Sequence, residues 1–266
     1  MAPQIGAFRD RFERAHPALV RIVFETDEPF DFAAGQYLSV RYGDRTRAYS
    51  IASSPNRDRA ELCIRRVPDG RLSPRLCEEL EVGDTLAIRG PSGHLLLEDA
   101  SHREMAFLAT GTGVAPMKSM IDYTFETGRD EHRGEKRDVW LFLGAAWKDD
   151  LPYHDDFTDL SENHDNFHYV PCLSRESWLT SWGGETEYIQ DALLKHVDER
   201  TLEDATFGRH MANMLHLQPP RTFSSRIDPG NLEVYACGIN AMVYSLETAV
   251  THLGVPTQQV HCEGYG

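Results

Sequence analysis

The sequence lacks the apolar runs of a membrane protein and the cysteine patterns of a disulfide-bonded or metal-binding protein. A bilayer-spanning helix needs about 20 consecutive apolar residues, and residues 139–147 are among the longest apolar stretches here. The N-terminus has no apolar segment typical of a signal peptide, so we expect a cytoplasmic protein. The cysteines are odd in number and include no CxxC pair: Cys63, Cys77, Cys172, Cys237 and Cys262. We therefore expect no disulfide framework, zinc site or iron–sulfur cluster within the chain.

Lysine and net positive charge are also scarce. The 27 basic residues include only four lysines, and 42 acidic residues give a net charge of −15. Nucleic-acid binding needs a clustered surplus of Lys and Arg, so we expect none. Residues 1–100 carry 14 basic and 16 acidic groups, whereas residues 101–266 carry 13 and 26. Two explanations stay open: surface solvation of the kind seen in salt-adapted proteins, or an Arg-rich half that docks an acidic partner. The arginines of that half are Arg9, Arg11, Arg14, Arg41, Arg45 and Arg65, among others.

Short apolar or alternating segments separated by turn residues fill the first part of the chain. Those expected to be strands are residues 19–26, 37–42, 48–51, 60–67 and 85–89. Evenly spaced strands with glycine and proline between them predict a closed antiparallel β-barrel. One helix is expected at about residues 73–80, where Ser73 followed by Pro74 predicts a side-chain cap on the first turn.

The pattern changes to alternating strands and helices from about residue 104. Strands are expected at residues 105–109, 139–144, 167–173 and 232–237, and helices at 116–126, 188–196 and 241–253. This alternation predicts an α/β domain, a parallel sheet covered on both faces. We therefore expect a β-barrel domain at residues 1–100 and an α/β domain at residues 101–266. Residues 201–230 are expected to form an irregular excursion, in which His210 and His216 lack the spacing of metal ligands.

A glycine-containing turn joins an expected strand to an expected helix at Gly111, Thr112, Gly113 and Pro116. Glycines let backbone N–H groups approach an anion, and the helix N-terminus adds partial positive charge. In open α/β sheets, nucleotides bind at such turns. A short glycine motif also fits a plain strand-to-helix turn, so this motif alone leaves both interpretations open.

A second motif, Arg47, Ala48, Tyr49 and Ser50, lies in the expected barrel. Along an alternating strand Arg47 and Tyr49 share one face. The forked donors of arginine and nearby hydroxyls suit a phosphate, and the ring can stack on a planar cofactor. A solvated barrel strand is the alternative interpretation.

Taken in order, these motifs resemble the ferredoxin–NADP+ reductase family. The similarity runs from Gly35 to the C-terminus and includes Gly-Arg-Leu-Ser at residues 70–73 and Cys-Gly at 237–238. Residues 261–265, His-Cys-Glu-Gly-Tyr, are similar to the terminal segment of plant-type members, although Gly266 follows the aromatic here. The stretch containing Ala145 and Ala146 is also similar. The resemblance implies an antiparallel FAD-binding barrel, then a parallel-sheet nucleotide-binding domain, with the active site at their cleft.

The resemblance assigns the flavin to the barrel. Arg47 is expected to pair with the flavin pyrophosphate, Tyr49 to pack on the isoalloxazine, and Ser50 to hydrogen-bond near flavin N5. The segment before Gly70 is shorter than in plant-type members; FAD is expected rather than FMN, with the pose of its adenosine half left open. The other residues implied are Cys63, Ile64 and Arg65 beside the ring system, and Gly70, Arg71, Leu72 and Ser73 at the pyrophosphate.

The resemblance assigns NADP(H) to the second domain. Thr112 and its neighbours are expected to hold the dinucleotide phosphates, and Cys237, next to Gly238, to pack near the nicotinamide. Each of these residues also has a purely structural interpretation, which for Cys237 is a small buried apolar residue at a strand end.

The tail supplies the remaining catalytic expectations. The resemblance to plant-type members implies that Tyr265 stacks over the flavin where the nicotinamide must go and swings out during turnover. Glu263 and the Ser50 hydroxyl offer a proton route for the reduced flavin. Solvation of the Glu263 carboxylate and hydrogen bonding of Ser50 within a turn are the alternatives.

The resemblance also implies that Ser174 and Arg175 bind the 2′-phosphate and that Tyr188 stacks on the adenine beside Gln190. Thr186 stands where plant-type members place a lysine, which removes one cation. NADP(H) is still the expected nucleotide, and an exposed loop is the alternative interpretation of Ser174 and Arg175.

The resemblance therefore implies electron exchange, through FAD, between NADP(H) and a one-electron partner protein, ferredoxin or flavodoxin. A reductase component of a multicomponent oxygenase using NAD(P)H is the nearest alternative. A non-catalytic flavin-binding module is the alternative from a different class.

Overall fold

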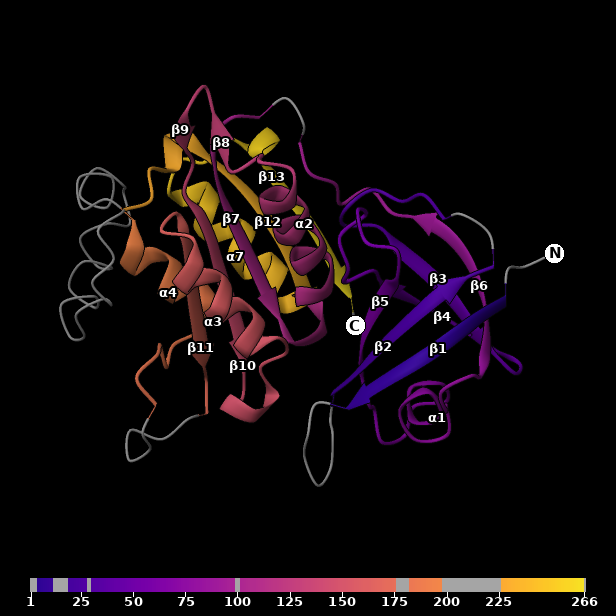
Figure 1. Ribbon diagram of the computed structural model, residues 1–266. Helices are drawn as coiled ribbons and strands as arrows, with labels where there is room; N and C mark the ends of the chain where they lie inside the picture. Colours follow the sequence, from indigo (N-terminus) through magenta and orange to yellow (C-terminus); the bar gives the residue numbers. More distant parts are fainter. Residues whose placement is uncertain are drawn as a thin grey trace. The chain divides into compact units, whose positions relative to one another are not determined.

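The computed structural model describes residues 4–11, 19–27, 30–98, 101–175, 182–197 and 226–265, and for residues 4–11 the backbone alone. The chain forms two units, residues 1–98 with 112–129 and residues 99–111 with 130–266. The first unit contains a six-stranded sheet, and the second contains a five-stranded sheet with helices and a small hairpin (Figure 1).

Antiparallel strands build the first unit. They are β1 (Gln4–Arg11), β2 (Leu19–Thr26), β3 (Tyr37–Tyr42), β4 (Arg45–Ser50), β5 (Ala60–Arg65) and β6 (Thr85–Ser92). Their order in the sheet is β4-β3-β6-β1-β2-β5. The outer strands meet, because Ile51, which follows β4, forms an antiparallel bridge with Leu62 of β5. The predicted antiparallel barrel is confirmed, and β1, which was not predicted, lies in the middle of the sheet.

Alternating side chains fill the barrel. Along β2, Val20, Ile22 and Phe24 are buried in one hydrophobic cluster, as expected when every second residue of a strand points inward. Leu76 and Cys77 of the short helix α1 (Ser73–Glu78) join the same cluster.

Helix α2 (Val114–Glu126) belongs to the first unit by its contacts, although the sequence analysis assigned it to residues 101–266. The Ser119 hydroxyl donates to the carbonyl oxygen of Ser53 at 2.7 Å. Gly35, with φ +101°, leaves room for α2, because a side chain there would lie 2.3 Å from the Met120 methyl carbon. The glycine thus permits the close approach of the helix.

Parallel strands form the main sheet of the second unit. They are β7 (Glu104–Thr110), β10 (Val139–Ala145), β11 (Phe167–Leu173), β12 (Leu232–Ile239) and β13 (Val260–Tyr265), in the order β11-β10-β7-β12-β13. The predicted parallel sheet is confirmed, and β13 adds a strand that was not predicted. A separate hairpin pairs β8 (Glu131–His132) with β9 (Glu135–Lys136).

Helices cover both faces of this sheet. Helix α4 (Ile189–His196) and helix α7 (Asn240–His252) share one hydrophobic cluster with Val170 and Cys172 of β11. Helix α3 (His154–Asn163) packs on the other face, where the Phe157 ring lies 5.5 Å from the Tyr169 ring. Tyr169 and Val170 are consecutive residues of a strand and therefore point to opposite faces.

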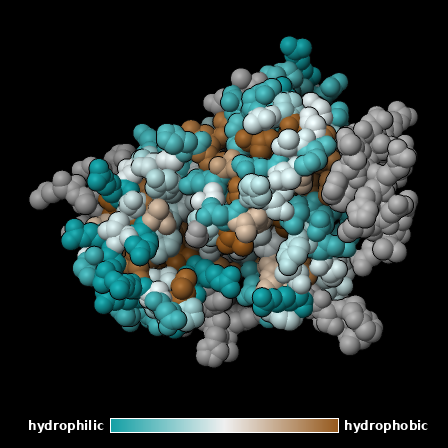
Figure 2. All heavy atoms as spheres, turned by 180° about the vertical axis from the view of Figure 1, so that it is seen from behind, coloured by the Kyte–Doolittle hydropathy of each residue, from teal (hydrophilic) through white to brown (hydrophobic). Residues whose placement is uncertain are grey.

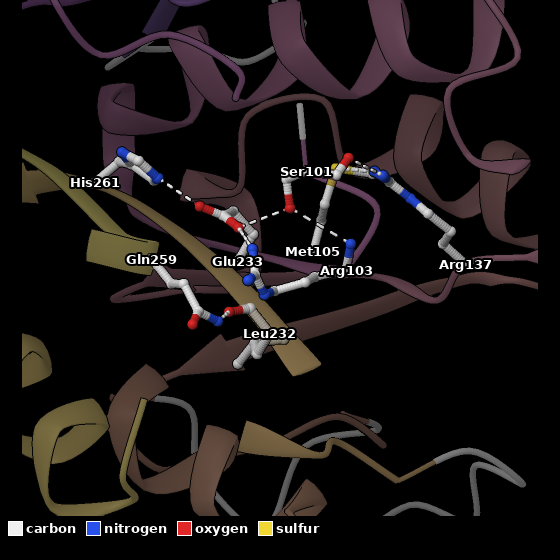
Figure 3. Close-up of polar contacts among 8 residues, drawn as sticks. All are labelled: Ser101, Arg103, Met105, Arg137, Leu232, Glu233, Gln259 and His261. Atoms are coloured by element: carbon white, nitrogen blue, oxygen red, sulfur yellow. Dashed lines mark hydrogen bonds and ion pairs between the residues drawn. The ribbon is translucent and has the colours of Figure 1, made fainter. Parts of the chain in front are cut away.

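A buried carboxylate ties the amino ends of the strands together (Figure 3). Glu233, near the start of β12, is 1% exposed and accepts a hydrogen bond from the Ser101 hydroxyl at 2.7 Å. Arg103 Nη1 lies 3.2 Å from the same oxygen, and His261 Nε2 of β13 lies 2.7 Å from the other one. These partners satisfy the buried charge, and the His261 contact joins β13 to β12.

Large apolar side chains reach the surface at a few positions among the described residues: Val67, Val82, Trp147, Tyr188, Ile239, Tyr244 and Tyr265. Figure 2 shows hydrophobic residues scattered among hydrophilic ones on the face it draws. Among the described residues, no helix combines the length and the apolar character needed to cross a membrane.

Candidate functional site: the carboxyl edge of the parallel sheet

The strand order of the second unit creates a switch point between β7 and β12. Strands β10 and β11 lie to one side of β7, and β12 and β13 lie to the other. In open α/β sheets ligands bind outside the carboxyl ends of the strands at this point. Strand β7 ends at Thr110 and continues into the turn Gly111–Gly113, while Cys237 of β12 pairs with Ala109 of β7. The glycine turn and the Cys237-Gly238 motif therefore meet at the ends of neighbouring strands.

Glycines keep this edge free of side chains. A Cβ at Gly238 would lie 2.4 Å from both Thr110 Oγ1 and the Met242 methyl carbon. A Cβ at Gly144, on the other side of β7, would lie 3.0 Å from Thr110 Cγ2. Thr110 is thus held between two positions at which no side chain fits.

Thr110 also has an unused polar atom. Its Oγ1 is buried and makes no hydrogen bond with any residue that the structure describes. Buried hydroxyls are normally satisfied, so an orphaned one at a ligand-binding edge fits a polar ligand atom. The bare glycine edge and this hydroxyl fit a nicotinamide dinucleotide. Thr110 and Gly144 were not among the predicted site residues; the signal for Thr110 is its position as the last strand residue before the glycine turn.

Three of the four predicted catalytic residues lie together at this edge. Parallel pairing sets Cys237 opposite Glu263 and Ile239 opposite Tyr265. The Tyr265 hydroxyl donates to the carbonyl oxygen of Thr110 at 3.1 Å, while the residue stays 40% exposed. The Tyr265 hydroxyl therefore links the end of β13 to the end of β7 across β12.

Burial determines the chemistry of the Cys237 thiol. It raises the thiol pKa to about 12, and the nearby Glu263 and Cys262 act in the same direction. At neutral pH the thiol is protonated. Cys237 therefore contributes a small neutral surface and is not a nucleophile.

The predicted adenosine residues lie at the ends of β10 and β11. The backbone N–H groups of Ser174 and Arg175 donate to the carbonyl oxygens of Ala145 and Ala146, each at 3.0 Å. Both Ser174 and Arg175 are exposed, so their side chains are available to a ligand. Glu176, the next residue, lies outside the described residues. 

The adenine platform is expected one segment further along the chain. Tyr188, just before α4, is 65% exposed, and Gln190 lies in the first turn of that helix. An exposed ring at a helix start offers a face on which a base can stack.

The predicted flavin residues of β4 lie in the first unit. Arg47 is exposed, while Tyr49 is half-buried and packs on the barrel core. Burial raises the Tyr49 pKa to about 12, with Cys77 adding to the shift and Arg47 opposing it. Ala48 is exposed and Ser50 is half-buried at the end of the strand. The ring of Tyr49 is thus neutral and fixed beside the Arg47 cation.

The other predicted flavin residues differ in exposure. Cys63, Ile64 and Leu72 are buried, and the side chains of Ile64 and Leu72 belong to the barrel core. Arg65 and Arg71 are exposed and, like Arg47, form no salt bridge within the described part of the chain. Guanidinium groups that are not held in salt bridges suit a phosphate ligand. The side chains of Ile64 and Leu72 fill the barrel core, so flavin contacts predicted at these positions would come from the adjacent Arg65 and Arg71.

The predicted cap of α1 is wrong in detail. Leu72, not Ser73, is the N-cap residue, and no side chain caps the helix. The Ser73 hydroxyl accepts instead from the backbone N–H of Val67 at 3.1 Å, and Gly70 N donates to Val67 O at 2.9 Å. These bonds close a tight turn in which a Cβ on Gly70 would lie 2.8 Å from Ser73 Oγ. The Ser73 hydroxyl therefore stabilises the turn at residues 67–70 and does not cap helix α1.

Comparison with known families agrees with this architecture. Residues 16–96 match the family described as an oxidoreductase FAD-binding domain. Residues 107–248 match the oxidoreductase NAD-binding domain.

Relatives with different names share substantial identity with the chain. The chain is 34% identical over 242 residues to ferredoxin–NADP reductase B of Sorangium cellulosum, covering 89% of this chain and 86% of that protein. It is 33% identical over 187 residues to the reductase component of phenol 2-monooxygenase from Pseudomonas sp. strain CF600, covering 69% of this chain and 51% of that protein. The chain thus spans about half the length of several curated relatives that it matches.

A solved structure of similar fold is a ferredoxin NADP+ reductase from Neisseria gonorrhoeae with bound FAD and NADP, with a TM-score of 0.75 and 21% identity. The match covers 99% of this chain and 98% of that one. The fold is therefore shared over the full length of both chains. From its two matched domains and its relatives, the chain belongs to the ferredoxin–NADP+ reductase family of oxidoreductases, which bind FAD and a nicotinamide dinucleotide.

Proposed function

We propose that the protein is an FAD-dependent reductase that moves electrons between NADP(H) and a one-electron carrier protein, ferredoxin or flavodoxin. The observation that carries this proposal is the grouping of Cys237, Glu263 and Tyr265 at the bare switch-point edge beside Thr110. The similarity to a protein named ferredoxin–NADP reductase over 89% of the chain supports the choice of partner.

The chemistry of the reaction belongs to the cofactor, since bound flavin takes up a hydride and gives up electrons one at a time. The protein residues bind and orient. Arg47, Arg65 and Arg71 are proposed to hold the FAD diphosphate, and Tyr49 to pack against the ring system. Gly70 supplies the tight turn for the pyrophosphate next to Ser73. Ser50 is proposed to hydrogen-bond at flavin N5, with Cys63 beside the ring.

The nicotinamide end is proposed to lie against Cys237 and Gly238. The protonated thiol sets the distance of approach by its size, because hydride transfer requires the reacting atoms near van der Waals contact. Gly111, Thr112 and Gly113 are proposed to receive the dinucleotide phosphates, with Pro116 in the following helix. Tyr265 occupies the nicotinamide position until the nucleotide displaces it, and Glu263 is the proposed proton carrier.

We propose NADP(H) as the nucleotide on the basis of Ser174 and Arg175. Both are exposed just beyond β11, and an arginine fork with a hydroxyl suits a 2′-phosphate. Tyr188 and Gln190 are proposed to hold the adenine, beside Ala145 and Ala146.

A second candidate is the reductase component of an oxygenase. The 33% identity to the phenol 2-monooxygenase reductase component favours it. In that case the electrons pass to the iron–sulfur partner of an oxygenase, and the site residues keep the same roles.

Steady-state reduction of a panel of acceptors tests the proposal. The purified FAD-loaded protein is given NADPH or NADH, with ferredoxin, flavodoxin, an oxygenase iron–sulfur protein or ferricyanide. We expect NADPH with ferredoxin or flavodoxin to give the highest kcat/KM among the protein acceptors. A clear preference for the oxygenase protein would favour the second candidate, and no oxidation of either nucleotide would support a non-catalytic flavin-binding module.

A further inference from the structure

A buried ion cluster lies next to the proposed 2′-phosphate residues. Lys195, in the last turn of α4, has a side chain that is 5% exposed. Its Nζ lies 2.9 Å from Glu185 Oε2 and 2.5 Å from Glu187 Oε1. One ammonium group therefore serves two carboxylates.

The backbone fixes this cluster beside the end of β11. Leu173 N donates to Glu185 O at 2.9 Å, and Glu185 N donates to Pro171 O at 3.2 Å, so that Glu185 pairs in parallel with Cys172. Glu187 follows two residues later and is at most about 7 Å further along the chain. Ser174 likewise stands two residues beyond Cys172. The Glu187 carboxylate is thus placed near the loop that presents Ser174 and Arg175.

An acidic residue here has a consequence for nucleotide choice. A carboxylate near the ribose suits the 2′-hydroxyl of NAD, whereas a cation suits the 2′-phosphate of NADP. An uncompensated Glu187 would repel a dianionic phosphate, and little water separates charges in a half-buried site. The Lys195 ammonium compensates this charge.

The charge states agree with a tight cluster. Burial, the largest influence, lowers the Lys195 pKa, but hydrogen bonds to Glu187 and Glu185 outweigh it and the pKa is raised. Burial raises the pKa of Glu185, and its interaction with Glu187 adds to the shift. Burial also opposes ionisation of Glu187, yet the hydrogen bonds with the Lys195 ammonium and the Glu185 carboxyl group lower its pKa. Asp191, in the first turn of α4, has a raised pKa through burial and repulsion by Glu187. Lys195 is the cation that the cluster shares.

We propose that Lys195 is a specificity-determining positioning residue: by pairing with Glu187 and Glu185, it offsets part of the negative charge of the acidic segment before α4 and allows the neighbouring Ser174 and Arg175 to accept a 2′-phosphate. This role rests on the proposed use of NADP(H). Thr186 is neutral and cannot offset the charge of Glu187; the buried Lys195 of α4 supplies that positive charge instead.

Binding of two nucleotide fragments tests this role without requiring turnover. Calorimetry on the full-length FAD-loaded protein measures 2′,5′-ADP, which carries the 2′-phosphate, and 5′-AMP, which does not. We expect Lys195→Met to weaken 2′,5′-ADP binding by about tenfold, equivalent to about 1.4 kcal/mol, and to change 5′-AMP binding less than about twofold. Lys195→Arg restores the charge and is expected to keep the preference for 2′,5′-ADP.

Two further variants keep the test sharp. Glu187→Gln removes the acidic charge and leaves Lys195 paired with Glu185; we expect tighter 2′,5′-ADP binding and an NADPH-to-NADH ratio of kcat/KM that rises by several fold. This variant decides the question if Lys195→Met does not fold. Lys136→Met removes a lysine whose partner is the exposed Asp165, and it is expected to leave both fragments unaffected.

Equal weakening of both fragments in Lys195→Met, or no change in Glu187→Gln, would overturn the role of Lys195. Failure of the proposed function is visible separately, as absence of electron transfer from either nucleotide to any acceptor in the unmodified protein. The fragment affinities still decide the role of Lys195 in that case.

Discussion

Cys237 and Thr110 give the carboxyl edge of the sheet two small neutral groups. Cys237 is a protonated thiol at neutral pH, since its pKa is about 12. Thr110 offers its carbonyl oxygen to Tyr265 and keeps a buried hydroxyl for another partner. Glu263, opposite Cys237, is the acidic side chain of this edge, and further charges lie at Arg175 and in the ion cluster around Lys195.

The Arg175 guanidinium is expected to discriminate between nucleotides. Arg175→Ala removes charge-assisted hydrogen bonds to the 2′-phosphate, each worth about 1.5–3 kcal/mol. We expect the KM for NADPH to rise by about tenfold or more and the KM for NADH to change little. Arg226→Ala, at another exposed arginine of the same unit, is the control. Equal changes for the two nucleotides in Arg175→Ala would contradict the role.

Glu104 makes stability depend on pH. Burial, with the nearby Asp138 and Asp228, raises its pKa from 4.5 to about 7. A carboxyl group with a raised folded-state pKa contributes stability below its unfolded pKa, and this contribution is lost as the pH rises through about 7. Discounted for the exposed part of the side chain, the effect is about 1 kcal/mol, or about 2–4 °C in Tm.

Glu104→Gln tests this directly by thermal unfolding between pH 4.5 and pH 8. We expect a higher Tm than the unmodified protein at pH 8 and a smaller decline in Tm as the pH rises. Parallel Tm curves for the two proteins across this range would show that Glu104 is not the titrating group.

Among the elements, strand β13 runs from the buried Glu233 network at the amino edge of the sheet to the candidate site at the carboxyl edge. His261, near its start, pairs with buried Glu233, and Gln259 Nε2 just before it donates to Leu232 O at 2.6 Å. Its far end carries Glu263 and Tyr265. The amino-edge network in Figure 3 thus fixes the strand that presents two proposed catalytic residues.

Replacing the ring of Tyr265 is expected to change nicotinamide binding. Tyr265→Ser removes the stacking group that competes with nicotinamide, so NADP+ should bind up to about tenfold more tightly and turnover should slow. Tyr265→Phe keeps the ring and loses only the hydrogen bond to Thr110, and it should resemble the unmodified protein more closely. A difference-absorbance titration measures both. An unchanged affinity in Tyr265→Ser would refute the gating role.

Elements with strong apolar patterns could be predicted from the sequence, and others could not. The bounds Leu19–Thr26, Tyr37–Tyr42 and Phe167–Leu173 agree with the predicted ranges. Helix α3 was missed because it is almost wholly polar and buries only Phe157; Asp155 and Asp156 favour its first turn. Strand β13 was missed because its pairing with β12 is a long-range contact that a short polar segment ending in Gly-Tyr does not reveal.

The site residues show the same limit. The structure brings Cys237, Gly238 and Tyr265, which the motifs singled out, to one edge of the sheet, where β12 and β13 end; their roles stay predictions. Thr110 and Lys195 carry no motif; their importance comes from neighbours distant in sequence, Gly238 in one case and Glu185 in the other. Such residues are found only when the sheet is assembled.

At the scale of the whole molecule, the uneven charge predicts how a partner docks. The arginines of the first 100 residues are expected to attract an acidic carrier protein. Arg41 and Arg65 are exposed. Arg45 forms a salt bridge with its neighbour Asp44, with 3.4 Å between Arg45 Nε and Asp44 Oδ2. Of the other arginines named, Arg9 and Arg11 are described by backbone alone, and Arg14 lies outside the described residues.

Salt and charge reversal test this docking. Raising the ionic strength from about 0.01 M to about 0.15 M shortens the screening length from about 30 Å to about 8 Å. We expect the KM for ferredoxin to rise over this range and to rise several fold in Arg41→Glu, with ferricyanide reduction unchanged. A salt-insensitive reaction, or cross-links to ferredoxin confined to residues 101–266, would contradict docking on the Arg-rich half.

The central claim is that flavin held by this chain carries electrons from NADPH to a one-electron protein. Anaerobic rapid mixing of the FAD-loaded protein with NADPH measures it directly through the visible flavin absorbance. We expect the flavin absorbance to be bleached on addition of NADPH and to return when oxidised ferredoxin or flavodoxin is added. A protein that stays colourless after incubation with FAD, or flavin that stays oxidised in excess NADPH, would contradict it.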